Sequence, residues 1–194
     1  MLFKKKRSEL TSLQIGNAVI DWEKDFADRQ RWVVTTFTQE FSTSVSPAML
    51  FKALILHSHN LVPKLVPQSI KSIEFSQGDG GVGSIKQTNF PEGSHFKYLK
   101  HKIDDLDVDN LMCKYTLIEG DVLGDKLQLI SCEVKMEASG SGSGSGSACK
   151  MTNHYHTKGE FVIKEENIKD GKDKTLGLYK VVEKYLLANP NIYA

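Results

Sequence analysis

This 194-residue sequence lacks most features of secreted or membrane-spanning proteins. Its three cysteines, Cys113, Cys132 and Cys149, are odd in number and form no C-x-x-C pair, so no disulfide framework is expected. No apolar run approaches the ~18 residues of a membrane span. The basic start at Lys4–Arg7 has no apolar segment behind it, unlike a signal peptide. We therefore expect free thiols and a reducing, cytoplasmic location, with the nucleus as an alternative because Lys4–Arg7 is a weak nuclear address.

An excess of charge of one sign is also absent. The net charge is +1, and the many lysines are interleaved with acidic residues. Proteins that bind nucleic acid usually carry a concentrated basic excess, so no nucleic-acid partner is expected. His154 and His156 share one face of a predicted strand, but no third ligand is evident, so no metal site is expected.

A glycine-rich stretch at residues 78–83 has the spacing G-x-G-x-x-G. A dinucleotide fingerprint needs a helix directly after the loop, because the helix start holds the pyrophosphate. Here Ile85, Thr88 and Phe90 give no helical stripe, so the loop joins two strands and no nucleotide cofactor is predicted. We interpret it as a structural hairpin whose N–H groups are able to form a small anion nest. Its glycines are Gly78, Gly80, Gly81 and Gly83.

The rest of the chain predicts an α+β fold. Residues 70–163 alternate between apolar and polar side chains, with turn signals at short intervals, as in an antiparallel meander. Ser46 and Pro47 mark the start of a helix, and a second short helix is predicted at 64–69. Leu178, Val182 and Leu186 belong to an apolar stripe of a long final helix, which ends before Pro190.

Two segments stand apart from this pattern. Residues 139–147 alternate serine and glycine between two predicted strands, which favours a hairpin tip over a domain boundary. Residues 1–32 show no turn signals that tie them to the strand pattern beginning at Val33, and they are predicted to be a disordered or weakly helical extension. The predicted working domain is therefore 33–194.

Aromatic side chains recur on the predicted strands. Aromatic rings with hydroxyl tips in an apolar hollow are typical of a small-molecule pocket, whereas the same pattern also fits a packed core. Periodicity alone leaves the two interpretations equally open. The candidate wall residues are Phe90, Phe96, Tyr98, Tyr115, Met151 and Tyr155.

Several segments resemble the plant pathogenesis-related class 10 proteins, the family of the major birch-pollen allergen. They include "SPAMLFKALIL", "NLVPKLVPQSIKS", "EGDVLGDKL", "YHTKGE" and "YLLANPNIYA". The resemblance covers about 33–194, and residues 1–32 have no counterpart in it. It implies a helix-grip, START-like fold, in which a seven-stranded curved sheet and two short helices enclose a hydrophobic cavity around the C-terminal helix. The glycine-rich loop then lies between the second and third strands of the family fold.

The resemblance also implies which residues contact ligands. Cys113 stands where many relatives carry tyrosine, which removes a ring and a hydroxyl from the proposed wall. The candidate ligand-binding residues are Leu54, Lys86, Phe90, Phe96, Tyr98, Cys113, Tyr115, Val134, Met151 and Tyr155.

The resulting functional hypothesis is a monomeric, non-enzymatic plant defence protein that carries apolar molecules such as flavonoids, cytokinins or brassinosteroids. The alternative is an abscisic-acid-type receptor that inhibits a protein phosphatase, although no gate or latch sequence is found. A ribonuclease would use Lys86, Glu183 and Tyr185, but Gln128 stands where an acid is needed. A Pictet-Spengler-type condensing enzyme would require a Lys/Glu/Tyr set, of which Lys86 alone is found.

Overall fold

The computed structural model describes residues 12–15, 18–21, 33–140 and 146–193. Seven of its strands form one antiparallel sheet. Their bounds are β3 (Val34–Thr43), β4 (Ser72–Gln77), β5 (Ile85–Asn89), β6 (Tyr98–Asp107), β7 (Met112–Gly120), β8 (Leu127–Ala138) and β9 (Ser147–Thr157). The order across the sheet is β3-β9-β8-β7-β6-β5-β4, a meander from β4 to β9 that β3 extends at one edge. This confirms the predicted seven-stranded α+β architecture.

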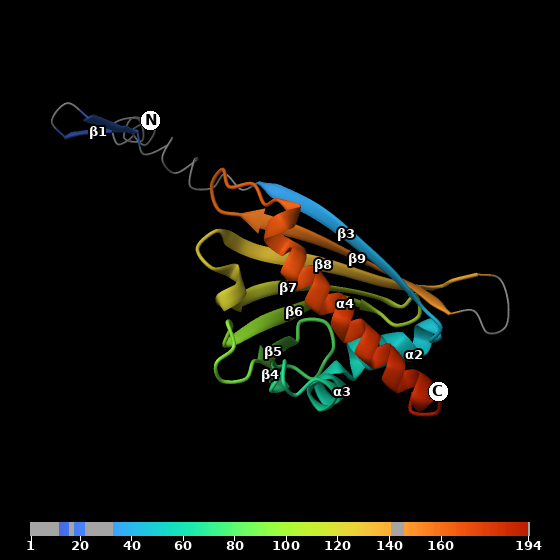
Figure 1. Ribbon diagram of the computed structural model, residues 1–194. Helices are drawn as coiled ribbons and strands as arrows, with labels where there is room; N and C mark the ends of the chain where they lie inside the picture. Colours follow the sequence, from blue (N-terminus) through green and yellow to red (C-terminus); the bar gives the residue numbers. More distant parts are fainter. Residues whose placement is uncertain (1–11, 16–17, 22–32, 141–145, 194) are drawn as a thin grey trace, which may run out of the picture.

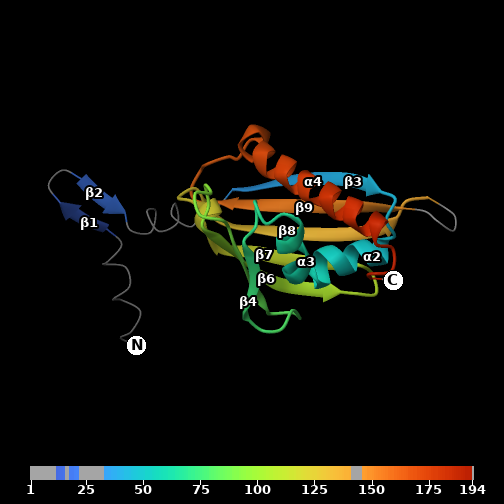
Figure 2. The same ribbon diagram turned by 60° about the horizontal axis from the view of Figure 1, so that its bottom comes forward.

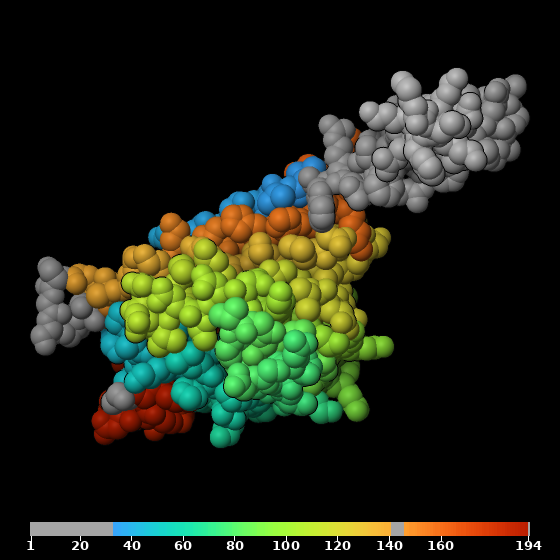
Figure 3. Space-filling view, turned by 180° about the vertical axis from the view of Figure 1, so that it is seen from behind, coloured from blue at the N-terminus to red at the C-terminus, as the bar shows by residue number. Residues whose placement is uncertain are grey.

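The strand of this sheet that comes first in the sequence, β3, is hydrogen-bonded to the strand that comes last, β9. β3 pairs with β9 over its full length, from Val34 opposite His156 to Thr43 opposite Ser147. Viewed from behind, the colour bands follow the strand order down the outer face (Figure 3). The opposite, inner face of the sheet is the one that the helices cover (Figure 1).

Three short helical segments connect β3 to β4. They are α2 (Pro47–Phe51), a π-helical turn η1 (Lys52–Leu56) and α3 (Ser58–Leu65), which lie together beside the sheet (Figure 2). Ser46 is the N-cap residue as predicted, but it contributes its carbonyl rather than its side chain, accepting the Leu50 N–H at 3.0 Å.

The second short helix differs from its prediction. The sequence predicts it at 64–69, beyond Pro63, but α3 begins at Ser58 and contains Pro63 in its second turn. Proline removes one backbone donor there and so weakens the helix. Leu61 and Val62 are 4% and 2% exposed, and burying them against the core offsets that loss.

The long C-terminal helix α4 (Glu165–Ala188) crosses the inner face of the sheet obliquely (Figure 1). It ends at Ala188, with Asn189 as its C-cap directly before Pro190, as predicted. Val182 and Leu186, in its C-terminal half, are fully buried. Each such burial contributes about 1.5–3 kcal/mol. The helix is therefore anchored mainly by that half, against a core that includes Leu50, Phe51, Val134, Met136 and Cys149.

The serine-glycine tract is a hairpin tip, as predicted. β8 and β9 pair antiparallel up to Ala138 opposite Ser147, so the tract connects two neighbouring strands. Residues 141–145, the centre of the tip, lie outside the described residues.

The described part of the N-terminal extension is a pair of strands. β1 (Ser12–Ile15) pairs antiparallel with β2 (Ala18–Asp21). These strands differ from the expectation of a disordered or weakly helical extension, because their alternation is too short to be distinguished from part of a helix. The remainder of residues 1–32 lies outside the described residues. Among the described helices, none is both long enough and apolar enough to cross a membrane.

Candidate functional site

A partly open cavity of about 410 Å³ lies between the inner face of the sheet, the short helices and the first and middle turns of α4. The helices contribute Leu54, Ser58 and Val62, whereas α4 contributes Gly171, Lys172, Thr175, Leu178 and Tyr179. Most of the wall is apolar. Val182 and Leu186, which are buried in the core further along α4, do not line the cavity.

The structure brings most predicted site residues to this cavity. Those that line it are Leu54, Lys86, Phe90, Cys113, Tyr115, Val134, Met151 and Tyr155. The two interpretations that periodicity left open are therefore combined at these positions. All of them border a hollow, and Cys113, Val134 and Met151 also belong to the packed core. Their contact with a ligand stays a prediction.

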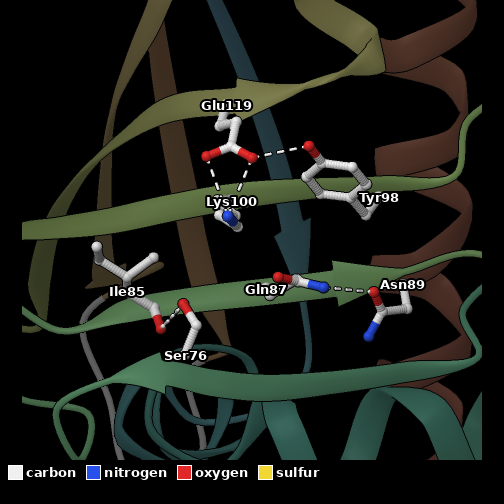
Figure 4. Close-up of polar contacts among 7 residues, drawn as sticks. All are labelled: Ser76, Ile85, Gln87, Asn89, Tyr98, Lys100 and Glu119. Atoms are coloured by element: carbon white, nitrogen blue, oxygen red, sulfur yellow. Dashed lines mark hydrogen bonds and ion pairs between the residues drawn. The ribbon is translucent and has the colours of Figure 1, made fainter.

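Phe96 and Tyr98 do not line the cavity, contrary to the prediction that they form its wall. The Tyr98 hydroxyl donates a hydrogen bond to Glu119 Oε1 at 2.7 Å, and Lys100 Nζ lies 3.0 Å from the same oxygen. Figure 4 shows this contact over strands β6 and β7. Phe96 precedes β6 and packs at 6.2 Å from the Phe90 ring, between ring centroids.

Tyr98 lies outside the cavity because side chains along β6 alternate between the two faces of the sheet. Leu99, His101 and Ile103 line the cavity, so Tyr98 and Lys100 point to the other face of the sheet. A shift of one residue in such a pattern exchanges the two faces completely. The sequence prediction placed the aromatic residue of β6 in the cavity wall, but this residue, Tyr98, lies on the outer face.

Other cavity residues are missing from the sequence prediction. Tyr179 is 6% exposed and lines the cavity, but it lies beside the predicted apolar stripe of α4. Its spacing from Val182 and Leu186, three and seven residues, is the signal that indicates it. Gln39 from β3 and Asn153 from β9 also line the wall, as polar residues between apolar neighbours.

Lys86 ties the sheet to the helices from inside the cavity. Its Nζ donates to the Ile55 carbonyl at 2.8 Å and to Ser58 Oγ at 3.1 Å. Ile55 belongs to the π-helical turn, where the ordinary i to i−4 bonding is interrupted. Burial lowers the pKa of Lys86, because the charged ammonium loses water.

His101 faces Lys86 across the β5–β6 pair. Its ring packs edge-on against Tyr115 with 4.9 Å between centroids. Burial, and secondarily the positive charge of Lys86, lowers the pKa of His101 to about 4. The imidazole is therefore uncharged at neutral pH.

The hydroxyls and thiols of the wall stay protonated. Burial raises the pKa of Tyr155 to about 12, and raises the pKa of Tyr115 and of Tyr179 well above the usual range. It also raises the pKa of the Cys113 thiol to about 11 and that of the Cys132 thiol to about 12. All three cysteines are free, as expected, and a protonated thiol is a poor nucleophile.

The glycine-rich loop connects β4 to β5, strand to strand, so it lacks the helix that a dinucleotide site requires. The Gly80 N–H donates to Ser84 Oγ at 3.0 Å, and the Gly83 N–H donates to the Ile103 carbonyl at 2.8 Å. Both donors are thus satisfied within the protein. Gly78 also needs its small size, because a Cβ there would lie 2.3 Å from Ser84 Oγ.

Within the described residues, no group of three or more His, Cys, Asp or Glu side chains is placed to hold a metal ion. A family model described as "Pathogenesis-related protein Bet v 1 family" matches residues 32–189. The chain belongs to this family. The Bet v 1 match begins one residue before the predicted domain.

Curated relatives in this family include proteins named as allergens and as pathogenesis-related proteins. The chain is 52% identical over 160 residues to the major strawberry allergen Fra a 1.08 of Fragaria ananassa, covering 82% of this chain and 98% of that protein. It is 53% identical over 161 residues to the pathogenesis-related protein STH-2 of Solanum tuberosum, covering 83% and 99%.

Solved structures show the same Bet v 1 fold. The crystal structure of Ara h 8.0201 has a TM-score of 0.70 and 36% identity, covering 80% of this chain and 99% of that one. A norcoclaurine synthase from Thalictrum flavum, solved in complex with dopamine and hydroxybenzaldehyde, has a TM-score of 0.65. Its identity is 19%, over 91% of this chain and 95% of that one, so the likeness is one of fold.

Proposed function

We propose that this protein is a plant defence-related carrier that binds apolar small molecules reversibly in its internal cavity. The observation that carries the proposal is the cavity of about 410 Å³ with a mainly apolar wall. Pockets of this size with a few polar groups are typical of small-molecule sites. Flavonoids, cytokinins and brassinosteroids are the ligand classes that we propose.

A binding role fits the chemistry of the wall better than catalysis does. Within the described chain, Lys86 is the only member of the ribonuclease set that lines the cavity, whereas Glu183 accepts a bond from the Ser44 backbone N–H at 3.4 Å. Gln128 offers no carboxylate for general base catalysis. A condensing enzyme would need a glutamate beside Lys86, and the described cavity lining contains no glutamate.

We further propose that the protein works as a monomer in the cytoplasm, with the nucleus as the alternative location. A protein phosphatase would be a partner only if the cavity selected abscisic acid. Free, buried thiols are compatible with a reducing compartment. Cell fractionation of the tagged full-length protein tests the location, and the proposal fails if the protein is secreted.

The proposed function is tested by calorimetric titration of the purified protein with a flavonoid, a cytokinin, a brassinosteroid and abscisic acid. We expect saturable binding of several of these, with a negative change in heat capacity from apolar burial. Selective binding of abscisic acid would favour the receptor alternative and require a phosphatase assay. Failure to bind any of the four would contradict the carrier proposal.

A further inference from the structure

The cavity wall carries cationic groups and no acidic ones. Among the described residues that line it, there is no Asp or Glu, whereas Lys86, Lys172 and His101 are present. Lys172 already has a counter-charge, because its Nζ lies 2.8 Å from Glu165 Oε1. The cationic character of the interior therefore comes from Lys86 and, after protonation, from His101.

Lys86 has no carboxylate partner in the described chain. Its two acceptors, the Ile55 carbonyl and the Ser58 hydroxyl, are neutral. Nζ also lies 5.5 Å from the centre of the Phe75 ring, which is uncharged. An ammonium has three donors, so one N–H is not used by these two oxygen acceptors. A buried charge with neutral partners is costly, and an anion beside it would recover much of that cost.

His101, once protonated, is the second wall group that gives the interior its cationic character, and it lies beside Lys86. It lies opposite Lys86 in the β5–β6 register, and both side chains line the cavity. The electrostatic neighbours of this pair are His59 from α3 and Cys113 from β7, neither of which is anionic at neutral pH. Tyr115 packs against the His101 ring with a protonated hydroxyl.

We propose that the cavity prefers ligands that join an apolar body to a single anionic head group, held by the Lys86 ammonium and the His101 ring. The head is a carboxylate, a sulfonate or an acidic phenolate, and the body occupies the apolar space toward Val134 and Met151. This specificity rests on the proposed binding function and narrows it. Binding occurs with proton uptake, because an anion stabilises the charged form of His101.

A matched pair of fluorescent probes tests the head group. 8-Anilino-1-naphthalenesulfonate and N-phenyl-1-naphthylamine share one apolar skeleton and differ by the sulfonate. We expect the wild-type protein to bind the sulfonate more tightly. Lys86→Met should lower the ratio of the two affinities about tenfold or more, because a charge-assisted bond is lost. The ratio is used because loss of the Ile55 and Ser58 contacts also changes the cavity shape for both probes.

A lysine variant outside the cavity serves as the control. Lys100→Met removes a charge on the outer face, where Lys100 is paired with Glu119. It should change the affinity ratio by less than about threefold, as expected for a partly exposed pair. Near-ultraviolet circular dichroism establishes that each variant is folded before titration.

A pH titration provides an independent readout. Between pH 7 and pH 5, affinity for the sulfonate should rise as pH falls, whereas affinity for the amine probe should not. His101→Asn should remove most of this rise. If the two probes bind the wild-type protein equally and Lys86→Met leaves their ratio unchanged, the head-group proposal is overturned while the carrier function stands. If neither probe binds, both proposals fail.

Discussion

Tyr98 and Tyr115 lie on adjacent strands of one sheet and have opposite surroundings. Tyr115 faces the cavity, where burial raises the pKa of its hydroxyl. Tyr98 faces outward and hydrogen-bonds to Glu119. At the residue scale, the face of the strand decides whether an aromatic side chain can take part in binding.

These two tyrosines form a matched test of the cavity wall. Tyr115→Ala should weaken binding of N-phenyl-1-naphthylamine by about tenfold, because an aromatic contact surface is lost. Tyr98→Ala should leave this affinity unchanged. Fluorescence titration of both variants provides the measurement, and equal losses in the two would show that the bound probe does not lie in the cavity.

His101 makes folding stability depend on pH. Its folded-state pKa, about 4, lies below the ordinary value of 6.5, so the unfolded chain binds more protons between these values. Stability is therefore complete above about pH 6.5 and decreases as pH falls toward 4, by up to about 3 kcal/mol from this residue. Urea unfolding at pH 7.0 and pH 4.5 measures the decrease.

The His101→Asn variant should lose most of this dependence. Burial also lowers the pKa of His59 and of His156, so the variant should still lose some folding stability as the pH falls. An unchanged pH dependence in the variant would show that His101 is not buried in its neutral form.

At the element scale, the sequence prediction of the cavity wall succeeds for three strands and fails for β6. Strands β7, β8 and β9 place Tyr115, Val134 and Met151 inward, as their alternation predicted. In β6, Leu99, His101 and Ile103 point inward in unbroken alternation, so the aromatic residue Tyr98 lies outside, although the register against β7 shifts between Lys100 and His101. A prediction that chooses the inner face of β6 by its aromatic residue therefore selects the wrong face.

Gly120, at the end of β7, lies directly against its pairing partner Leu99 in β6. Its φ is 140°, and an added Cβ would lie 2.7 Å from Leu99 Cα. Gly120→Ala should destabilise the protein by about 2–4 kcal/mol, through overpacking and backbone strain. Gly124→Ala, where a Cβ would meet nothing within 4 Å, should cost about 1 kcal/mol from its φ of 54° alone. Urea denaturation of both variants measures the difference, and equal costs would exclude the predicted clash.

The two ends of α4 differ in how they are anchored. Val182 and Leu186, near its C-terminal end, lie in the core, whereas its first and middle turns border the cavity and contain two glycines, Gly171 and Gly177. Gly177 is exposed, and a Cβ there would meet nothing within 4 Å.

Gly177→Ala should therefore stabilise the helix by about 1 kcal/mol and raise the melting temperature by about 2–4 °C. Differential scanning calorimetry measures this change. A lower melting temperature would mean that the helix is distorted at Gly177 in a way that requires glycine.

At the scale of the whole molecule, the architecture of the domain could be predicted from the sequence. The alternation of residues 70–163, the Ser46-Pro47 helix start and the Pro190 stop each indicated an element that the structure contains. The position of the helix at Ser58–Leu65 and the paired strands Ser12–Ile15 and Ala18–Asp21 could not be predicted. Short segments take their structure from neighbours more than from local preference.

The cavity is likewise a property of the whole molecule. Gln39, His101 and Tyr179 are far apart in sequence and meet only because β3, β6 and α4 surround one space. Gln39 and His101 have no sequence signal of their own for a wall position, and the helical spacing of Tyr179 indicates only burial. Their contribution depends on how completely α4 fills the concave sheet, which no local pattern encodes.

The most direct test of binding in the cavity is a methyl NMR titration of the protein labelled at its methionine methyl groups, with N-phenyl-1-naphthylamine as ligand. Met151 lines the cavity, whereas Met112 lies on the same sheet outside its lining. We predict a saturable shift of the Met151 signal and no comparable shift of the Met112 signal. A saturable shift at Met112 alone, or no saturable shift at either residue, would contradict the assignment of this cavity as the binding site.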